Sequence, residues 1–128
     1  KQVVNVAGDG SFHMNCTELS TAASYGVPVI ELILNNSVLG MVRQWQKLFY
    51  DWRFSQTDLD PNTDFCKLAE AFGVKALRIT KREEIEPVLR EALAEKGPVL
   101  IDCRISKDIN VLPMVPAGAS VEDPILEM

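Results

Sequence analysis

The chain has 128 residues, of which 47% are hydrophobic and 24% are charged, and 13 Lys and Arg against 18 Asp and Glu leave a net charge of −5. This length and mixture are typical of one globular domain with a sizeable core. The acidic balance, without a basic cluster interleaved with aromatic residues, excludes a nucleic-acid surface, and no apolar run approaches the roughly 20 residues that cross a bilayer, so no membrane partner is expected.

The start of the chain predicts a strand, a helix and a second strand. Residues 3–8 are rich in β-branched residues and end in glycine, which is typical of a buried parallel strand. A helix is expected up to Gly26, with Asn15 as its cap and Glu18 three residues further on. Residues 29–34 form the next apolar run. Together these segments predict a βαβ unit.

The rest of the chain alternates helices and strands again. Apolar residues at helical spacing predict helices over 38–49 and 65–72, and many turn-forming residues predict a surface loop over 50–64. Short apolar runs predict two further strands over 74–79 and 99–105.

One more helix is expected between these last two strands, with Thr80 and Glu83 as a capping box at its start and Gly97 after its end. Strands that alternate with helices predict an α/β fold of three layers, a mostly parallel sheet with helices on both faces. We assign residues 1–107 to this domain and 108–128 to a C-terminal tail punctuated by proline and glycine.

The cysteines indicate a reducing compartment. Cys16, Cys66 and Cys103 are odd in number, widely spaced and form no CxxC pair, which argues against a disulfide framework and a zinc site. We therefore expect a soluble, cytoplasmic protein whose thiols lie in its core. Because a predicted strand begins within two residues of Lys1, we also expect the chain to be the back part of a longer protein.

Two polar motifs follow the first two predicted strands, Gly-Asp-Gly at 8–10 and Asn-Asn at 35–36. Ligands bind beyond the carboxyl ends of parallel strands, and neighbouring strands lie about 5 Å apart, so Asp9 and Asn36 meet if these strands are adjacent. A carboxylate and an amide oxygen suit Mg²⁺, which completes its coordination with waters and phosphate oxygens. The backbone amides of residues 10 and 11 can donate to an anion. The pair predicts a metal-bridged diphosphate site, although either motif alone is typical of a turn.

The stretches "GDGSFHMNCTELSTA" and "VIELILNN" resemble the thiamine diphosphate motif, which begins with GDG and ends with NN. The continuation "NNSVLGMVRQWQKLFY" and the terminal "VLPMVPAGAS" resemble the catalytic subunits of acetolactate synthase, also called acetohydroxyacid synthase. The resemblance covers essentially the whole chain and implies the C-terminal domain of a subunit with three domains. It also implies a transferase that decarboxylates pyruvate and joins the two-carbon unit to a second 2-oxo acid, giving 2-acetolactate or 2-aceto-2-hydroxybutyrate in branched-chain amino acid biosynthesis.

The resemblance implies roles for single residues. The Mg²⁺ ligands would be Asp9, the side chain of Asn36 and the backbone carbonyl of Val38. The cofactor-binding residues would be Gly8, Asp9, Gly10, Ser11, Asn36, Ser37, Val38, Leu39, Gly40 and Met41. The substrate channel would be lined by Val42, Trp45 and Phe49, residues that their helical spacing alone would place in a core. The single histidine, His13, is given no catalytic role.

The resemblance also implies partners outside this chain. The activating glutamate would come from another domain across a subunit interface, so no catalytic residue is expected here. The family implies the chain's own N-terminal domains, a homodimer or homotetramer, a small regulatory subunit, and FAD in the full-length enzyme. Two alternatives stay open: another thiamine diphosphate enzyme, such as pyruvate oxidase, glyoxylate carboligase or a sulfoacetaldehyde-type enzyme, or a noncatalytic flavodoxin-like binding module.

Overall fold

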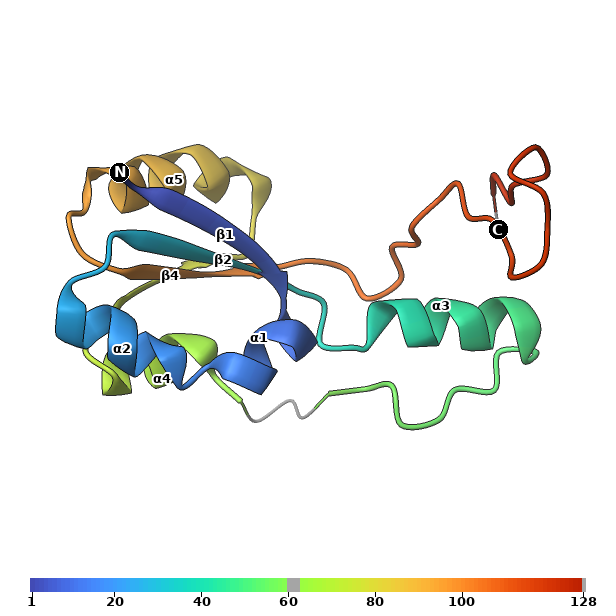
Figure 1. The fold of residues 1–128 in the computed structure, drawn as a ribbon, viewed down its shortest axis with the longest axis horizontal. Helices are drawn as coiled ribbons and strands as arrows, with labels where there is room; N and C mark the ends of the chain where they lie inside the picture. The colour runs from blue at the N-terminus through green and yellow to red at the C-terminus, as the bar shows by residue number, and fades with distance from the viewer. Residues whose placement is uncertain (60–62, 128) are drawn as a thin grey trace.

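A computed structural model describes residues 1–59 and 63–127 (Figure 1). Within them the strands are β1 (Val3–Gly8), β2 (Val29–Asn35), β3 (Lys75–Ile79) and β4 (Val99–Arg104). The helices are α1 (Asp9–Asn15), α2 (Glu18–Tyr25), α3 (Gly40–Phe49), α4 (Phe65–Ala71) and α5 (Ile85–Ala94), with a 3-10 turn, η1, at Arg82–Glu84. Residues 60–62 of the predicted loop and residue 128 of the predicted tail lie outside the described residues.

The described strands form one parallel sheet in the order β1-β2-β4-β3. β1 pairs with β2 from Val3 opposite Val29 to Gly8 opposite Leu34. The strands that carry the two polar motifs are therefore neighbours, and their carboxyl ends lie at the same edge of the sheet. β4 lies between β2 and β3 and is the most deeply buried strand.

Helices cover both faces of the sheet, as predicted. Figure 1 shows α1, α2 and α4 on one face and α5 on the other. The first face buries a cluster made of Phe12, Leu19, Ile33, Phe65, Ala69, Val74 and Leu100. The second face buries a smaller cluster made of Ile30, Ile79, Ala92, Val99 and Ile101. The predicted three-layer α/β fold is confirmed, and burial of these apolar side chains is its main source of stability.

The first strand is less buried than its sequence predicts. Val3, Val4 and Val6 expose 58%, 49% and 57% of their surface. Among the described strands, β1 pairs only with β2 and lies at one edge of the sheet, while α5 packs against β3 at the opposite edge. The prediction of a strand over 3–8 is confirmed, and the prediction that it is buried is wrong.

The helix after β1 also differs from the prediction. α1 begins at Asp9, directly after the strand, and includes Asn15, so this residue does not cap the next helix. α2 begins at Glu18, and its N-cap Thr17 makes no side-chain hydrogen bond. The end of α2 is as predicted, because Gly26 adopts a left-handed conformation (φ 59°) that glycine accepts without strain.

The capping box before α5 lies one residue later than predicted. Glu84, rather than Glu83, reaches back: its Oε2 accepts from the backbone N–H groups of Thr80 (2.8 Å) and Lys81 (3.1 Å) and from Thr80 Oγ1 (3.0 Å). The shift follows from η1, which begins at Arg82 and so makes Lys81 the N-cap. These hydrogen bonds favour the carboxylate and lower the pKa of Glu84 below its usual value.

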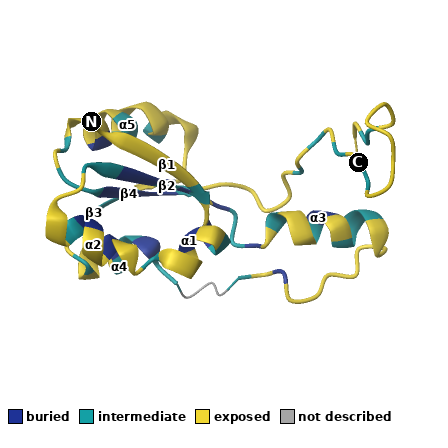
Figure 2. Ribbon diagram, viewed as in Figure 1, coloured by how far each residue is buried: buried dark blue, intermediate teal, exposed yellow. Residues whose placement is uncertain are grey.

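A second part of the chain extends away from the sheet. α3 and the segment after β4 lie side by side beyond the carboxyl ends of the strands (Figure 1), and Figure 2 shows that few of their residues are buried. In the tail, Met114 and Ile125 exchange backbone hydrogen bonds of 3.0 and 2.8 Å. The cysteines are free thiols of intermediate burial. Among the described helices, none has the length and apolar character needed to cross a membrane.

We predict that Glu84→Gln lowers the melting temperature near neutral pH, because a neutral amide accepts the hydrogen bonds of Thr80 and Lys81 more weakly than a carboxylate. The folded-state pKa of Glu84 lies below 4.5, so its contribution to stability is complete above that pH and is lost as the pH falls through the lowered value. Thermal unfolding followed by circular dichroism measures both effects. Glu83→Gln is the matched control, and equal melting of the two variants at neutral pH would contradict the assignment.

Candidate functional site

The carboxyl ends of β1 and β2 bring the two polar motifs into contact. Asp9, the first residue of α1, is 3% exposed although it is charged. Its Oδ2 accepts a hydrogen bond from the backbone N–H of Ser37 at 2.7 Å. A residue from the first motif is thus bonded to the residue that directly follows the second motif, 28 positions later in the chain.

The chain turns sharply at Ser37, after β2. Ser37 has φ 60°, a left-handed conformation that is uncommon for a residue other than glycine. Oδ1 of Asn35 accepts from both the backbone N–H and the Oγ of Ser37 at 3.1 Å, and Oδ1 of Asn36 accepts from the N–H of Val38 at 3.1 Å. Because side chains of the motif itself satisfy these backbone groups, the turn holds Asn36 and Val38 in fixed positions.

A cavity of about 430 Å³ lies beside this turn. Its wall includes every predicted cofactor-binding residue except Ser37, namely Gly8, Asp9, Gly10, Ser11, Asn36, Val38, Leu39, Gly40 and Met41. Residues 8–11 form the end of β1 and the start of α1. We call this cavity the main pocket.

Two glycines of the main pocket stand where an added Cβ would make a tight contact. A Cβ at Gly40 would lie 3.0 Å from Nδ2 of Asn36, and a Cβ at Gly10 would lie 3.0 Å from Cδ2 of Leu39. Glycine at these positions lets the turn after β2 approach the starts of α1 and α3 closely. The result is a tightly packed junction at one wall of the pocket.

The start of α3 supplies donors to the main pocket. α3 begins at Gly40, two residues later than the predicted helix, and its N-cap Leu39 makes no side-chain hydrogen bond. The first backbone N–H groups of a helix have no partner within the helix and carry its positive end, which favours an anion. Since Gly40, Met41 and Val42 line the pocket, phosphate oxygens fit this end of it. Val38 lies before the helix, is 3% exposed, and forms an isolated bridge with Asp58.

The oxygen donors around Asp9 suit a hard cation. Burial raises the pKa of Asp9, while the hydrogen bond from Ser37 and the positive charge of Arg104 act in the opposite direction. The available donors are one carboxylate, the amide oxygen of Asn36 and the carbonyl of Val38, a set of the kind that Mg²⁺ accepts together with waters and phosphate. No group of three or more His, Cys, Asp or Glu side chains gathers within residues 1–59 and 63–127.

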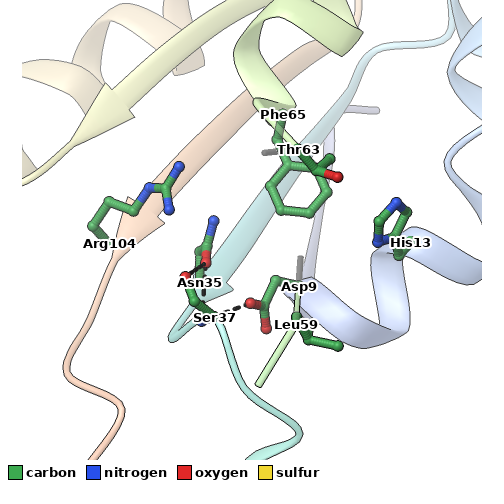
Figure 3. A pocket seen from close by; sticks show the side chains of 8 residues that line it. All are labelled: Asp9, His13, Asn35, Ser37, Leu59, Thr63, Phe65 and Arg104. Atoms are coloured by element: carbon green, nitrogen blue, oxygen red, sulfur yellow. Dashed lines mark hydrogen bonds between the residues drawn. The ribbon is translucent and has the colours of Figure 1, made fainter. Parts of the chain in front are cut away.

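A second, much smaller cavity lies beside Asp9 and has a volume of about 10 Å³, close to the space that one water needs. Figure 3 shows Asp9, Asn35, Ser37 and Arg104 around it, with His13 on the opposite side. The His13 ring packs edge-on against Phe65, with 5.7 Å between the ring centres. His13 lines this small cavity and not the main pocket.

The residues predicted to line the substrate channel lie on α3, and they differ in whether they line the main pocket. Val42, Trp45 and Phe49 are 49%, 48% and 47% exposed, so their helical stripe is not a core face in this chain. Val42 lines the main pocket, whereas Trp45 and Phe49 do not. Trp45 and Phe49 pack edge to face, with ring centres 6.1 Å apart.

Sequence reasoning missed one wall of the main pocket, which Leu34, Gln44, Ile105, Ile109 and Val111 provide. Gln44 is 3% exposed and holds the tail: its Oε1 accepts from the N–H of Val111 at 2.7 Å, and its Nε2 donates to the Val111 carbonyl at 3.0 Å. Leu34 is the last apolar residue of β2 before the Asn-Asn motif, so its place at the carboxyl end of the strand could have suggested it. No local pattern marks Gln44, whose partner is 67 residues away.

We predict that Gln44→Ala releases the tail from α3, because it removes both hydrogen bonds to Val111. Trypsin cleavage after Lys107 should become several-fold faster in the protein without cofactor, measured by mass spectrometry of the fragments.

The matched control is Gln46→Ala on the same helix. Gln46 makes the equivalent pair of bonds to Ser55 in the loop after α3, so this variant should accelerate cleavage after Arg53 and leave Lys107 unchanged. Unaltered cleavage at Lys107 in Gln44→Ala would show that the clamp does not hold the tail.

Comparison with known proteins identifies relatives of this chain. Residues 1–103 match the family described as thiamine pyrophosphate enzyme, C-terminal TPP binding domain. The chain is 50% identical over 121 residues to the mitochondrial acetolactate synthase catalytic subunit of Saccharomyces cerevisiae, which covers 94% of the chain and 18% of that protein. It is 46% identical over 118 residues to the acetolactate synthase isozyme 2 large subunit of Escherichia coli, which covers 92% and 22%.

A solved structure is similar as well. The thiamine diphosphate-dependent 4-hydroxybenzoylformate decarboxylase of Rhodococcus jostii RHA1 matches with a TM-score of 0.77 and 35% sequence identity, over 83% of this chain and 20% of that chain. The chain therefore spans about a fifth of the length of the proteins it matches.

Proposed function

Because the chain belongs to the thiamine pyrophosphate enzymes, as their C-terminal TPP binding domain, we propose that it is the diphosphate-binding part of an acetolactate synthase catalytic subunit. Thiamine pyrophosphate and thiamine diphosphate are two names for one cofactor. The observation that carries the proposal is the hydrogen bond between Ser37 and Asp9, because it joins the two halves of the motif beside the main pocket, which Asp9 and Asn36 both line.

The residues of the pocket fit the cofactor's diphosphate and its metal. Asp9, the amide oxygen of Asn36 and the carbonyl of Val38 would hold Mg²⁺. The glycines at 8, 10 and 40 line the pocket without a side chain of their own, and the start of α3 would donate to phosphate oxygens. The other residues predicted to bind the cofactor lie next to these ligands and glycines in the sequence, namely Ser11, Ser37, Leu39 and Met41.

Thiamine diphosphate, when bound, supplies the carbon nucleophile and the electron sink for the decarboxylation of a 2-oxo acid. This chain's part is to anchor the diphosphate and to wall the cavity with apolar side chains such as Leu34, Met41 and Ile109. Val42, Trp45 and Phe49 would line the substrate channel from α3. The substrates would be pyruvate and a second 2-oxo acid, and the products 2-acetolactate or 2-aceto-2-hydroxybutyrate for branched-chain amino acid biosynthesis.

Other thiamine diphosphate enzymes would share the same anchor. Relatives that are 45–50% identical to the chain are named acetolactate synthases, which supports acetolactate synthase over a pyruvate oxidase or glyoxylate carboligase. A noncatalytic flavodoxin-like module would need no metal-dependent binding of the cofactor, which separates it from this proposal.

The proposal extends to partners outside the chain. The relatives are named as catalytic or large subunits, which supports a small regulatory subunit as a partner. We further propose the chain's own N-terminal domains, which would supply the activating glutamate, a homodimer or homotetramer, and FAD in the full-length enzyme. We also propose that residues 1–107 form the binding domain and 108–128 its tail. A cytoplasmic location of the protein stays a prediction, since two yeast relatives are named mitochondrial.

We predict that Asp9→Ala abolishes Mg²⁺-dependent binding of thiamine diphosphate in the full-length protein that carries this chain, because it removes the only carboxylate of the proposed ligand set. Isothermal titration with thiamine diphosphate, with and without Mg²⁺, measures this. Asp123→Ala, an exposed tail residue, should bind as the unaltered protein does. An unchanged affinity in Asp9→Ala would refute the metal assignment.

We predict that the 128-residue chain alone forms no acetolactate from pyruvate, thiamine diphosphate and Mg²⁺, because the activating glutamate is expected in another domain. A colorimetric assay for acetolactate, with the full-length protein as the positive control, checks this. Product from the chain alone would show that the chain contains a complete catalytic site.

A further inference from the structure

The most deeply buried charge near the site is Asp102, on β4, with 0% of its surface exposed. Its Oδ2 accepts from Nε of Arg78 and from Nε of Arg104, each at 3.1 Å. Its Oδ1 accepts from Nδ2 of Asn35 at 2.8 Å. A buried carboxylate is tolerated when charged donors pair with it, and here the two guanidinium groups leave one oxygen to bind Asn35.

The hydrogen bond from Asn35 to Asp102 fixes which way the Asn35 amide faces. Since Nδ2 is directed to the carboxylate of Asp102, Oδ1 faces the turn and accepts both donors of Ser37. An amide in the opposite orientation would turn a donor toward the N–H of Ser37 and an acceptor toward Asp102, and both hydrogen bonds would be lost. Asp102 therefore selects the one orientation of Asn35 that supports the turn.

The same chain of hydrogen bonds reaches the proposed metal ligands. The Ser37 N–H that binds Asn35 also donates to Oδ2 of Asp9 at 2.7 Å. Ser37 lies between Asn36 and Val38, the other two proposed ligands. Figure 3 shows Asp9, Asn35 and Ser37 joined by these bonds, with Arg104 beside them. The buried carboxylate of β4 is thus connected to all three ligand positions through two residues.

We propose that Asp102, acting through Asn35, is a positioning residue of the Mg²⁺-diphosphate site, an inference that rests on the proposed function. It holds the Ser37 turn so that the oxygens of Asp9, Asn36 and Val38 face one cation. It also keeps the guanidinium of Arg104 paired. Arg104 lines the same small cavity as Asp9, so without Asp102 its free charge would compete with the cation for the Asp9 carboxylate.

The test uses the full-length protein with two variants, Asp102→Asn and Asn35→Ala. The first removes the charge that directs Asn35 and pairs Arg104, and the second removes the link to Ser37 while Asp102 keeps both arginines. If Asp102→Asn does not fold, Asn35→Ala decides the question alone.

The matched control is Glu31→Gln. Glu31 is also a buried carboxylate, 8% exposed, and both of its oxygens accept from Asn5, at 3.0 and 2.8 Å. It lies on the same strand as Asn35, four residues and about 13 Å from it. Glu31→Gln removes a buried charge from the sheet and leaves in place the hydrogen bonds that link Asp102, Asn35 and Ser37.

The readouts are the Mg²⁺ concentration that half-saturates thiamine diphosphate binding, followed by titration calorimetry, and the melting temperature without ligands. Loss of a group that orients metal ligands typically weakens metal affinity 10–100-fold. We expect a shift of about that size in Asp102→Asn and Asn35→Ala, with kcat restored at saturating Mg²⁺. Glu31→Gln should leave the Mg²⁺ dependence unchanged whatever its melting temperature.

The outcomes separate the two levels of the proposal. Unaltered protein that binds the cofactor equally well with and without Mg²⁺ would overturn the proposed function and the positioning role with it. Mg²⁺-dependent binding in the unaltered protein, combined with an unchanged half-saturation in both variants, would overturn the positioning role alone. A shift that Glu31→Gln shares to the same extent would also overturn it, because the effect would then report general destabilisation.

Discussion

The hydrogen bond from the backbone N–H of Ser37 to the carboxylate of Asp9 is the contact on which the site depends. It exists because β1 and β2 are adjacent and parallel, so that a residue following one strand meets a residue following the other. Three features bring Ser37 close to Asp9: the register of the sheet, the left-handed turn at Ser37 and the glycines around this turn. Backbone hydrogen bonds between β1 and β2 set the spacing of the two strands, and this spacing brings Asp9 and Ser37 within reach of each other.

The molecule has a well-packed part and a more exposed part. The sheet with α1, α2, α4 and α5 holds the buried apolar clusters, while α3 and the tail carry exposed apolar side chains on one side of the main pocket. The proposed anchor for the diphosphate lies where the two parts join. A rigid anchor with a less buried wall suits a cofactor whose charged end is fixed while its other end meets a substrate.

Much of this arrangement follows from the sequence. Apolar runs ending in Gly8 and Asn35 mark both strands and their ends, and alternation with helices predicts the parallel sheet and its ligand edge. The features that escaped prediction arise from contacts between distant residues. The exposure of β1 depends on which strands become neighbours. The links from Asn35 to Asp102 and from Gln44 to Val111 each join residues 67 positions apart, and neither has a local pattern. The capping residue is Glu84 and not the predicted Glu83, because the 3-10 turn starts at Arg82 and makes Lys81 the N-cap.

The exposed edge strand has a consequence for handling the chain. β1 presents Val3, Val4 and Val6 to solvent along a strand that, within the described part of the chain, pairs with β2 alone. Unpaired backbone groups next to β-branched side chains form a template for adding another strand. A preparation of this chain by itself is therefore prone to self-association through β1, and a charged residue in place of Val4 would act as a gatekeeper against aggregation without entering the cofactor pocket.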